Sequence, residues 1–167
     1  LNQQPTNNIA IKIPSPILSP SDINYLANQT DWFPSSTISC SIGGNDNLKT
    51  RIDRIKKAVE KKIINGTKII FLSDIALEDG QTFIPMPLVV SAVHHHLVMK
   101  KLRSKASIVC ISGNCIEDHH FAVLIALGAS GIYPIGSYTT IQKYNPESDF
   151  YISLDNYRHS IEKGLLK

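Results

Sequence analysis

Three consecutive histidines, His94, His95 and His96, form the densest group of metal-ligating side chains in the sequence. They lie in an apolar stretch with helical spacing, where neighbouring side chains point about 100° apart. Zinc ligands on a helix are instead spaced three or four residues apart, so that they share one face. The run therefore favours histidines that pack or hydrogen-bond separately, and it predicts no metal site.

A second group combines Cys110 and Cys115 with the pair His119 and His120. Cys110 lies within an apolar run typical of a buried strand, where free cysteine usually acts as a small hydrophobic side chain. Cys115 lies in the turn before a predicted helix, and a helix N-terminus can activate a thiolate. No pattern supplies a base or an oxyanion donor for it. Packing and capping are the favoured roles, and a free-standing metal-dependent hydrolase that uses Asp74, Cys115 and the paired histidines stays an alternative.

Polar residues follow two of the predicted strands. Asp74, Glu78 and Asp79 come after residues 67–72, and the segment Ser-Gly-Asn at 112–114 follows the next strand. Strand-end carboxylates often serve catalysis in β/α folds, whereas a solvated acidic loop is the more ordinary explanation. The 112–114 segment has too few glycines for a phosphate-binding loop, although a helix start there is a weak anion site.

The positive charge is concentrated in one segment. Residues 47–64 contain seven Lys or Arg and two Asp or Glu, so this segment has a net charge of +5. Because the whole chain has a net charge of +3, the remaining residues sum to −2. Their apolar residues recur every three or four positions, which predicts an amphipathic helix ending at Asn65-Gly66. Nucleic-acid binding needs clustered basic residues, but interleaved aromatics are lacking. We therefore expect a solvated outer face and no nucleic-acid partner, with a basic-helix binding module as a further alternative.

Strands and helices alternate along the chain. Strands are expected at 37–42, 67–72, 107–111 and 131–135, with helices at about 48–64, 88–102 and 114–127 between them. This series predicts an α/β fold of serial β/α units with a mainly parallel sheet and right-handed crossovers. An open sheet and part of a β/α barrel both satisfy the pattern. In either case ligands or partners would meet the loops that follow the strands, at 43–46, 73–82, 112–116 and 136–140.

The chain divides into three predicted segments. Residues 1–18 form an extended lead-in, residues 19–140 form the α/β portion, and residues 141–167 form a connecting segment, irregular over 141–154, with a helix capped by Asp155. Ser19 and Pro20 are typical of a helix start, so a short helix ending near Asn28 is expected first. Because the first residue is Leu1 and no helix stop precedes Lys167, we expect a piece of a longer protein.

Composition narrows the class of protein. The 167 residues are 43% hydrophobic and 19% charged, which fits one globular domain and excludes a disordered chain. No apolar run approaches the length of about 18 residues that a membrane span needs. Three scattered cysteines and the lack of a signal-peptide pattern favour a cytoplasmic protein.

Several motifs together resemble one family. The segments at 15–18 (SPIL), 84–85 (IP), 92–97 (AVHHHL), 112–113 (SG) and 119–122 (HHFA) occur in the order found in the later part of the central domain of the glutamate synthase large chain. Those at 156–158 (NYR) and 162–167 (EKGLLK) resemble the opening of the FMN-binding synthase domain that follows it. Single pieces would be weak evidence, and their joint order makes the resemblance specific.

The resemblance implies a function. Glutamate synthase is an oxidoreductase that makes glutamate from glutamine and 2-oxoglutarate: an amidotransferase domain releases ammonia, and FMN beside an iron–sulphur cluster reduces the resulting imine. Electrons come from a nicotinamide cofactor, through an electron-donor subunit, or from ferredoxin. The central domain joins the two catalytic domains and is related in fold to the synthase barrel. Cys40, Cys110 and Cys115 are not cluster ligands by this match.

For this chain the resemblance implies an interdomain scaffold that is inactive by itself and holds no catalytic, cofactor-binding or metal-binding residue. Its partners would be the amidotransferase and FMN-binding synthase domains of the same chain, in the cytoplasm, or in a plastid for a ferredoxin-dependent enzyme. Six residues at or near the strand ends are expected to contact those domains or to border the ammonia route: Ser73, Asp74, Ser112, Gly113, His119 and His120.

Overall fold

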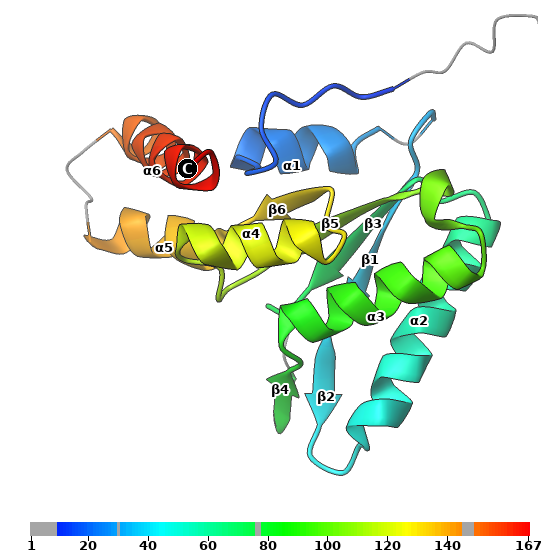
Figure 1. The fold of residues 1–167 in the computed structure, drawn as a ribbon. Helices are drawn as coiled ribbons and strands as arrows, with labels where there is room; N and C mark the ends of the chain where they lie inside the picture. Colours follow the sequence, from blue (N-terminus) through cyan, green and yellow to red (C-terminus); the bar gives the residue numbers. More distant parts are fainter. Residues whose placement is uncertain (1–9, 30, 76–77, 145–148) are drawn as a thin grey trace, which may run out of the picture.

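The computed structural model describes residues 10–29, 31–75, 78–144 and 149–167 (Figure 1). In chain order its elements are α1 (Pro20–Ala27), β1 (Ser35–Ser39), β2 (Ser41–Gly43), α2 (Leu48–Ile64), β3 (Ile69–Ser73), β4 (Gln81–Phe83), α3 (Met86–Met99), the short 3-10 helix η1 (Arg103–Lys105), β5 (Ser107–Ile111), α4 (Asp118–Ala126), β6 (Gly131–Tyr133), α5 (Ile135–Tyr144) and α6 (Phe150–Leu165). Within these ranges no helix is both long and apolar enough to cross a membrane.

The main sheet has four parallel strands in the order β1-β3-β5-β6, joined in series by α2, α3 and α4. The register pairs Ile70 with Ile108 and Cys110 with Ile132, so apolar side chains lie next to one another across the sheet. The predicted α/β class with serial β/α units is confirmed, and the arrangement is compatible with part of a β/α barrel.

The two faces of the sheet have different covers. Alternate residues such as Ile70, Leu72 and Ile108 belong to a large core that includes side chains of α2, α3 and α4. The other alternate residues, among them Phe71 and Val109, belong to a smaller cluster with Leu18 and Leu26 of the lead-in and α1. Figure 1 shows α1 on one side of the sheet and α2 and α3 on the other. Both faces are apolar because both are covered.

The predicted strand at 37–42 is two strands in different sheets. The backbone N–H of Cys40 donates to the oxygen of Ser73, and from Ser41 onward the chain pairs antiparallel with β4. The predicted loop at 73–82 runs into this strand, β4, which is too short to show a periodic pattern. The lead-in supplies further pairing at the opposite edge, where Ile17 forms a parallel bridge with Ile132 of β6.

Four further predictions near helix ends are wrong. Helix α4 begins at Asp118 and not at Asn114, because the chain takes a longer turn after β5. Residues 136–140 belong to α5 and are not a loop. Residues 141–154 are largely helical, apart from 145–148, which lie outside the described residues. The cap of α6 is Asp149, whose carboxylate accepts from the backbone of Tyr151 and Ile152, and not Asp155.

The first two helices have the ends that the sequence predicts. The Ser19 side chain accepts from the backbone of Asp22, whose carboxylate accepts in return from the Ser19 N–H at 2.8 Å. Helix α2 is capped by the Asn47 side chain and followed by Gly66, whose φ of 100° is strained for any residue with a Cβ.

Candidate functional site

The carboxylate of Asp74 ties together the carboxyl ends of β3 and β5. Its Oδ2 accepts a hydrogen bond of 2.7 Å from the Ser112 hydroxyl, and its Oδ1 accepts one of 2.8 Å from the Gly113 N–H. Ser112 Oγ in turn accepts from the Asn114 N–H at 3.2 Å. Asp74 is only 5% exposed, so these bonds compensate for the loss of water around a buried carboxylate. The cluster fixes the loop after β5 relative to β3.

Close backbone packing holds the same loop from the side of α5. A Cβ added at Gly136 would overlap the carbonyl oxygen of Gly113, so only glycine allows α5 to approach this closely. The Ser137 hydroxyl donates to the carbonyl of Cys115 at 2.9 Å. Tyr157 of α6 donates from its hydroxyl to the carbonyl of Ile116 at 2.8 Å. Two helices that come later in the chain therefore clamp the segment after β5.

A cavity of about 190 Å³ lies beside Asp74. Its walls come from the start of α3, the loop after β5 and α4, and they include Met86, Cys115, His120 and Leu124. His120 Nδ1 accepts from the backbone N–H groups of Ile116 and Glu117, at 3.2 and 3.3 Å. A neutral His120 therefore carries its ring proton on Nε2. The ring serves as a cap for α4.

The three cysteines are buried and have unreactive thiols. Burial raises the pKa of Cys40 and of Cys115 to about 12, and it raises the pKa of Cys110 as well. Because the thiolate is the nucleophile and the metal ligand, such thiols are poor at both tasks near neutral pH. The described part of the chain contains no group of three or more His, Cys, Asp or Glu side chains placed to hold a metal ion.

All six predicted contact residues lie at this end of the sheet, and five of them belong to the group around Asp74. Asp74, Ser112 and Gly113 are in direct contact, and His120 lines the cavity beside Asp74. Ser73 is buried at the end of β3, where its carbonyl accepts from Cys40 as described above. His119 is separate from this group: its side chain is exposed and its Nδ1 lies 3.3 Å from the Glu117 carboxylate.

The paired histidines also explain why the metal hypothesis fails on geometry. His119 and His120 have ring centroids 4.3 Å apart, but His120 Nδ1 is occupied by two backbone donors. Asp74 already accepts from Ser112 and Gly113, and Cys115 is a neutral thiol. These side chains share a neighbourhood without converging their free ligand atoms on one point.

The histidine triplet has three separate partners, as its spacing predicts. His94 Nδ1 accepts from Arg103 Nε at 3.1 Å, and His95 Nδ1 lies 2.8 Å from the carbonyl of Ser91. His96 Nε2 lies 2.7 Å from a Glu60 carboxylate oxygen and so links α3 to α2. The triplet is structural.

The basic helix α2 has its Lys and Arg residues mostly on the outer side, as the sequence predicts. Lys56 pairs with Asp53 at 2.6 Å, and Arg54 pairs with Asp46 at 3.4 Å. Arg51 differs from the rest because its guanidinium donates to the carbonyls of Ser41, at 2.7 Å, and Ser39, at 3.3 Å. That residue therefore supports the point where the chain passes from β1 to β2.

Sequence reasoning missed the residues that clamp the loop from a distance. Ser137 and Tyr157 lie 22 and 41 residues from the carbonyls that they bind. Tyr138 likewise donates from its buried hydroxyl to the carbonyl of Leu18, which lies 120 residues earlier, at 3.0 Å. A single sequence offers no signal for such pairs, beyond the general rule that a buried tyrosine hydroxyl seeks an acceptor.

Serial β/α units, a four-stranded parallel sheet and a hydrogen-bonded cluster at the strand carboxyl ends define the chain as an α/β domain compatible with part of a β/α barrel. The family model described as the glutamate synthase central domain matches residues 1–167. The chain belongs to this family.

Its relatives are much longer proteins. The chain is 33% identical to the ferredoxin-dependent glutamate synthase of Pyropia yezoensis over 100% of its own length, and 34% identical to the glutamate synthase [NADPH] large chain of Bacillus subtilis over 94%. It is 32% identical to the chloroplastic ferredoxin-dependent enzyme of Spinacia oleracea over 98%. The chain spans 12%, 10% and 11% of these three relatives, about a tenth of their length.

Proposed function

We propose that this chain acts as the interdomain scaffold of a glutamate synthase, an enzyme that converts glutamine and 2-oxoglutarate to glutamate by ammonia transfer and FMN-dependent reduction. The match of the central-domain family model to all 167 residues carries the proposal. The scaffold holds an amidotransferase domain and an FMN-binding synthase domain of the same polypeptide in a fixed relation. It performs no chemical step itself.

The arrangement at the carboxyl end of the sheet supports a scaffold. Asp74 accepts from Ser112 and Gly113, so both of its oxygens are engaged in holding two loops, and its burial keeps it away from a substrate in solution. Cys115 is a neutral thiol near pH 7. Most catalytic sites contain groups with perturbed pKa values and hydrogen-bonding atoms that are free to bind a substrate. Here the hydrogen-bonding atoms bind to other groups of the protein.

The contacts with neighbouring domains are proposed at the surface that this cluster supports. Ser73, Asp74, Ser112, Gly113 and His120 set the shape of the loops there, and exposed His119 lies at the rim. These loops touch the neighbouring domains or border the ammonia route. Residues 141–167 continue from the scaffold into the start of the FMN-binding domain.

The cofactors and electron donor of the enzyme belong to other domains in this proposal. FMN and an iron–sulphur cluster would be held by the synthase domain, and ferredoxin or a nicotinamide-dependent subunit would supply electrons. Relatives named for ferredoxin and for NADPH match at 33% and 34% identity, so we infer that the scaffold is common to both types. The cytoplasm is the proposed location, or a plastid for a ferredoxin-dependent enzyme.

The test is an assay of the purified chain with glutamine, 2-oxoglutarate and a chemically reduced electron donor. The proposal expects no release of ammonia and no glutamate above the rate without protein. Mixing the chain with separately purified amidotransferase and FMN-binding domains of the same enzyme should give a complex on a sizing column. Turnover by the chain alone, or a failure of both domains to bind it, would reject the proposal.

A further inference from the structure

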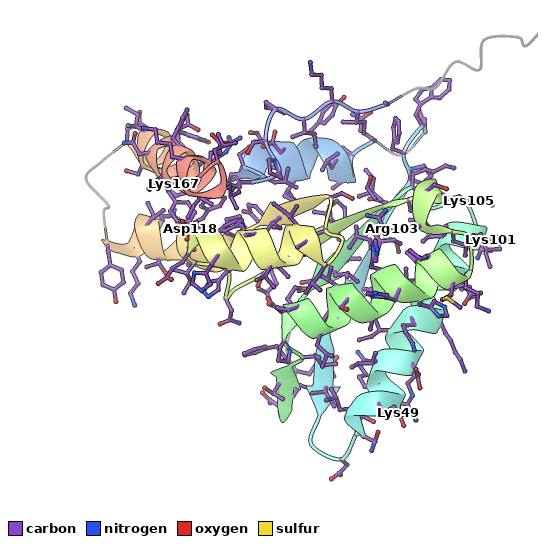
Figure 2. All side chains as sticks on the ribbon, in the orientation of Figure 1. Lys49, Lys101, Arg103, Lys105, Asp118 and Lys167 are labelled. Atoms are coloured by element: carbon purple, nitrogen blue, oxygen red, sulfur yellow. The ribbon has the colours of Figure 1, made fainter. Side chains whose placement is uncertain are left out.

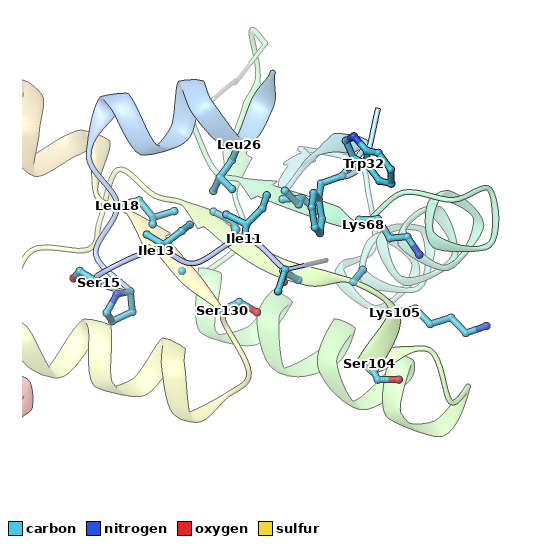
Figure 3. A pocket seen from close by; sticks show the side chains of 18 of the residues that line it. Ile11, Ile13, Ser15, Leu18, Leu26, Trp32, Lys68, Ser104, Lys105 and Ser130 are labelled. Atoms are coloured by element: carbon cyan, nitrogen blue, oxygen red, sulfur yellow. The ribbon is translucent and has the colours of Figure 1, made fainter. Parts of the chain in front are cut away.

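A groove of about 940 Å³ lies at the amino-terminal end of the sheet, away from the cluster around Asp74 (Figure 3). One wall is the lead-in from Ala10 to Leu18 together with Leu26 and Trp32, and the other is the set of segments that precede β3, β5 and β6. Its volume is at the upper end of the range of ligand pockets, about 300–1,000 Å³. The groove can therefore accept more than a small metabolite.

The floor of the groove is aliphatic. Ile11 and Ile13 of the lead-in are partly exposed, and they pack over Ile69 and Val109 of the sheet, which are buried. Hydroxyl groups of Ser104, Ser107 and Ser130 lie along the opposite wall. Trp32 stands at one end and is 66% exposed, which is unusual for the largest apolar side chain. The groove thus offers apolar surface to side chains and the hydroxyls of Ser104 and Ser107 to backbone groups, whereas Ser130 Oγ is bound within the protein.

The charge of the lining has one sign. Lys68, Arg103 and Lys105 all line the groove, and no Asp or Glu is among the described residues that do so. Arg103 is bound internally, because its guanidinium donates to His94 Nδ1 and to the carbonyls of Ala106 and Gly128. Lys68 and Lys105 are exposed and make no ion pair with the described part of the chain. These two ammonium groups are therefore available to an anionic partner.

We propose that this groove binds an extended acidic peptide segment of a partner protein, whose apolar side chains pack on the exposed parts of Ile11 and Ile13 while its carboxylates pair with Lys68 and Lys105. Charge complementarity selects an acidic occupant, and the exposed apolar surface of Ile11, Ile13 and Trp32 favours apolar side chains between the acidic ones. The proposal concerns a second surface, distinct from the strand-end loops, and it does not depend on the identity of the neighbouring domains.

A peptide fits this groove better than a nucleic acid does. Single-stranded nucleic acids bind on rows of exposed aromatic rings combined with many basic residues. Here Trp32 is the one strongly exposed ring in the described lining, and the floor around Ile11 and Val109 is aliphatic. Aliphatic floors with a few flanking charges are typical of grooves that hold apolar side chains of a peptide.

Trp32 provides the signal for the test, because it is the single tryptophan of the chain. We would titrate the protein with a synthetic hexapeptide of alternating glutamate and leucine and follow tryptophan fluorescence. The matched probe is the hexapeptide of alternating lysine and leucine. The proposal expects saturable binding of the acidic peptide only, weakened by salt at about 0.5 M, where charges are screened within a few ångströms.

Charge-reversal variants test the two lysines. K68E/K105E should weaken binding of the acidic peptide at least about tenfold, because it removes both cations and adds like charge. The control K49E/K57E makes the same change in net charge on α2, where Lys49 lies far from Lys105 (Figure 2). It should leave the dissociation constant within about twofold, since distant surface charges are screened. Circular dichroism of both variants checks their folding.

Four results of the binding experiments would overturn the proposal. The first two are no fluorescence change with the acidic peptide up to about 1 mM, which corresponds to a binding free energy of about −4 kcal/mol, and equal binding of the lysine–leucine peptide. The other two are equal weakening by both double variants and tighter binding of oligothymidine than of the acidic peptide. The salt dependence of the unaltered protein keeps the test decisive if K68E/K105E does not fold. Dimerisation of the chain in sedimentation, abolished by K68E/K105E, would assign the groove to a second copy and also overturn it.

Discussion

The two ends of the parallel sheet use their polar groups in opposite ways. At the carboxyl end, Ser112 and Gly113 both donate to Asp74, and this carboxylate and the three cysteine thiols are buried. At the amino end, Lys68 and Lys105 lie along the edge of a large open groove and form no ion pair with a described residue. The difference separates the polar residues that hold the fold from those that remain free to bind.

The sequence favours the carboxyl end of the sheet as the functional end, whereas the structure favours the amino end. The carboxyl end contains the cysteines, the paired histidines and the acidic loop, so it attracts catalytic and metal hypotheses. In the structure it is a hydrogen-bonded joint. The amino end contains scattered lysines and serines with no motif, yet it lines a groove of about 940 Å³. Richness in reactive residue types is a poor guide to available chemistry when those residues are buried.

The largest expected effect is on the reactivity of the cysteine thiols, because reactive thiols at the carboxyl end would contradict the difference between the two ends. With the pKa of Cys40 and Cys115 raised to about 12, the folded protein at pH 8 has very little thiolate. We expect labelling by a disulfide reagent to be about a thousandfold slower than in the unfolded chain. Absorbance of the released thiolate follows the reaction. A cysteine that labels within minutes in the native protein would mean that the carboxyl end is open to chemistry.

The same shifts set a pH dependence. A thiol whose folded pKa is raised favours the folded state below its unfolded pKa of about 8.5 and loses that contribution as the pH rises toward the folded value. The free energy of unfolding should therefore fall between about pH 8 and pH 9.5. Replacing Cys115 by Ala should make this fall shallower, and an unchanged slope would contradict the burial of its thiol.

The next largest effect is on the free energy of unfolding, through the hydrogen bonds that Asp74 accepts. Asp74→Ala leaves the Ser112 hydroxyl and the Gly113 N–H without their acceptor, and we expect a loss of about 3 kcal/mol in the free energy of unfolding. Asp74→Asn keeps one carbonyl acceptor and should lose about half as much. The exposed control Asp79→Ala should change stability by less than about 0.5 kcal/mol. Urea denaturation measures all three, and equal effects at both positions would show that Asp74 is not a structural centre.

The third effect separates bound from free cations at the amino end. Arg103→Ala removes donors to His94, Ala106 and Gly128, and it should cost about 2 kcal/mol of stability. Lys105→Ala should leave stability within about 0.5 kcal/mol, because its side chain is exposed and pairs with no described residue. Thermal denaturation distinguishes the two variants. A large loss for Lys105→Ala would mean that this lysine is structural and would weaken its assignment to a ligand.

The smallest expected effect is on the pKa of Glu60, where α2 and α3 are in contact. The hydrogen bond from His96 holds the pKa of Glu60 below its ordinary range, with Lys100 nearby adding to the shift. His96→Ala should raise the pKa of Glu60 toward its ordinary value, about 4.3. The stabilising contribution is present above that pH and disappears as the pH falls through the lowered pKa. Carbon NMR of the Glu60 carboxyl measures the shift, and an unchanged pKa would contradict the pairing.

Much of the fold could be predicted from single residues and spacing. Apolar runs indicated the four parallel strands, and Asn65-Gly66 marked the end of α2 because such caps are local in sequence. The breaks that were missed depend on distant partners. The chain turns at Cys40 because Ser73 and β4 lie beside it, and no local signal reports those neighbours.

The candidate site could be predicted only as a location. The rule that strand carboxyl ends meet correctly places Asp74 beside Ser112 and Gly113. It gives no orientation, so it also grouped His119 with them, although His119 points to solvent. The amino-end groove escaped prediction entirely, because its walls come from the lead-in and from three segments far apart in sequence.

The most direct test of the scaffold uses the complete glutamate synthase polypeptide that we propose contains this chain. The measurement is the ratio of glutamate formed to glutamine hydrolysed, before and after Asp74→Ala. A scaffold predicts that glutamine hydrolysis and synthesis from added ammonia both continue, while the ratio falls because ammonia escapes between misaligned domains. Loss of glutamine hydrolysis, or of glutamate synthesis from added ammonia, would give Asp74 a catalytic role and contradict the account.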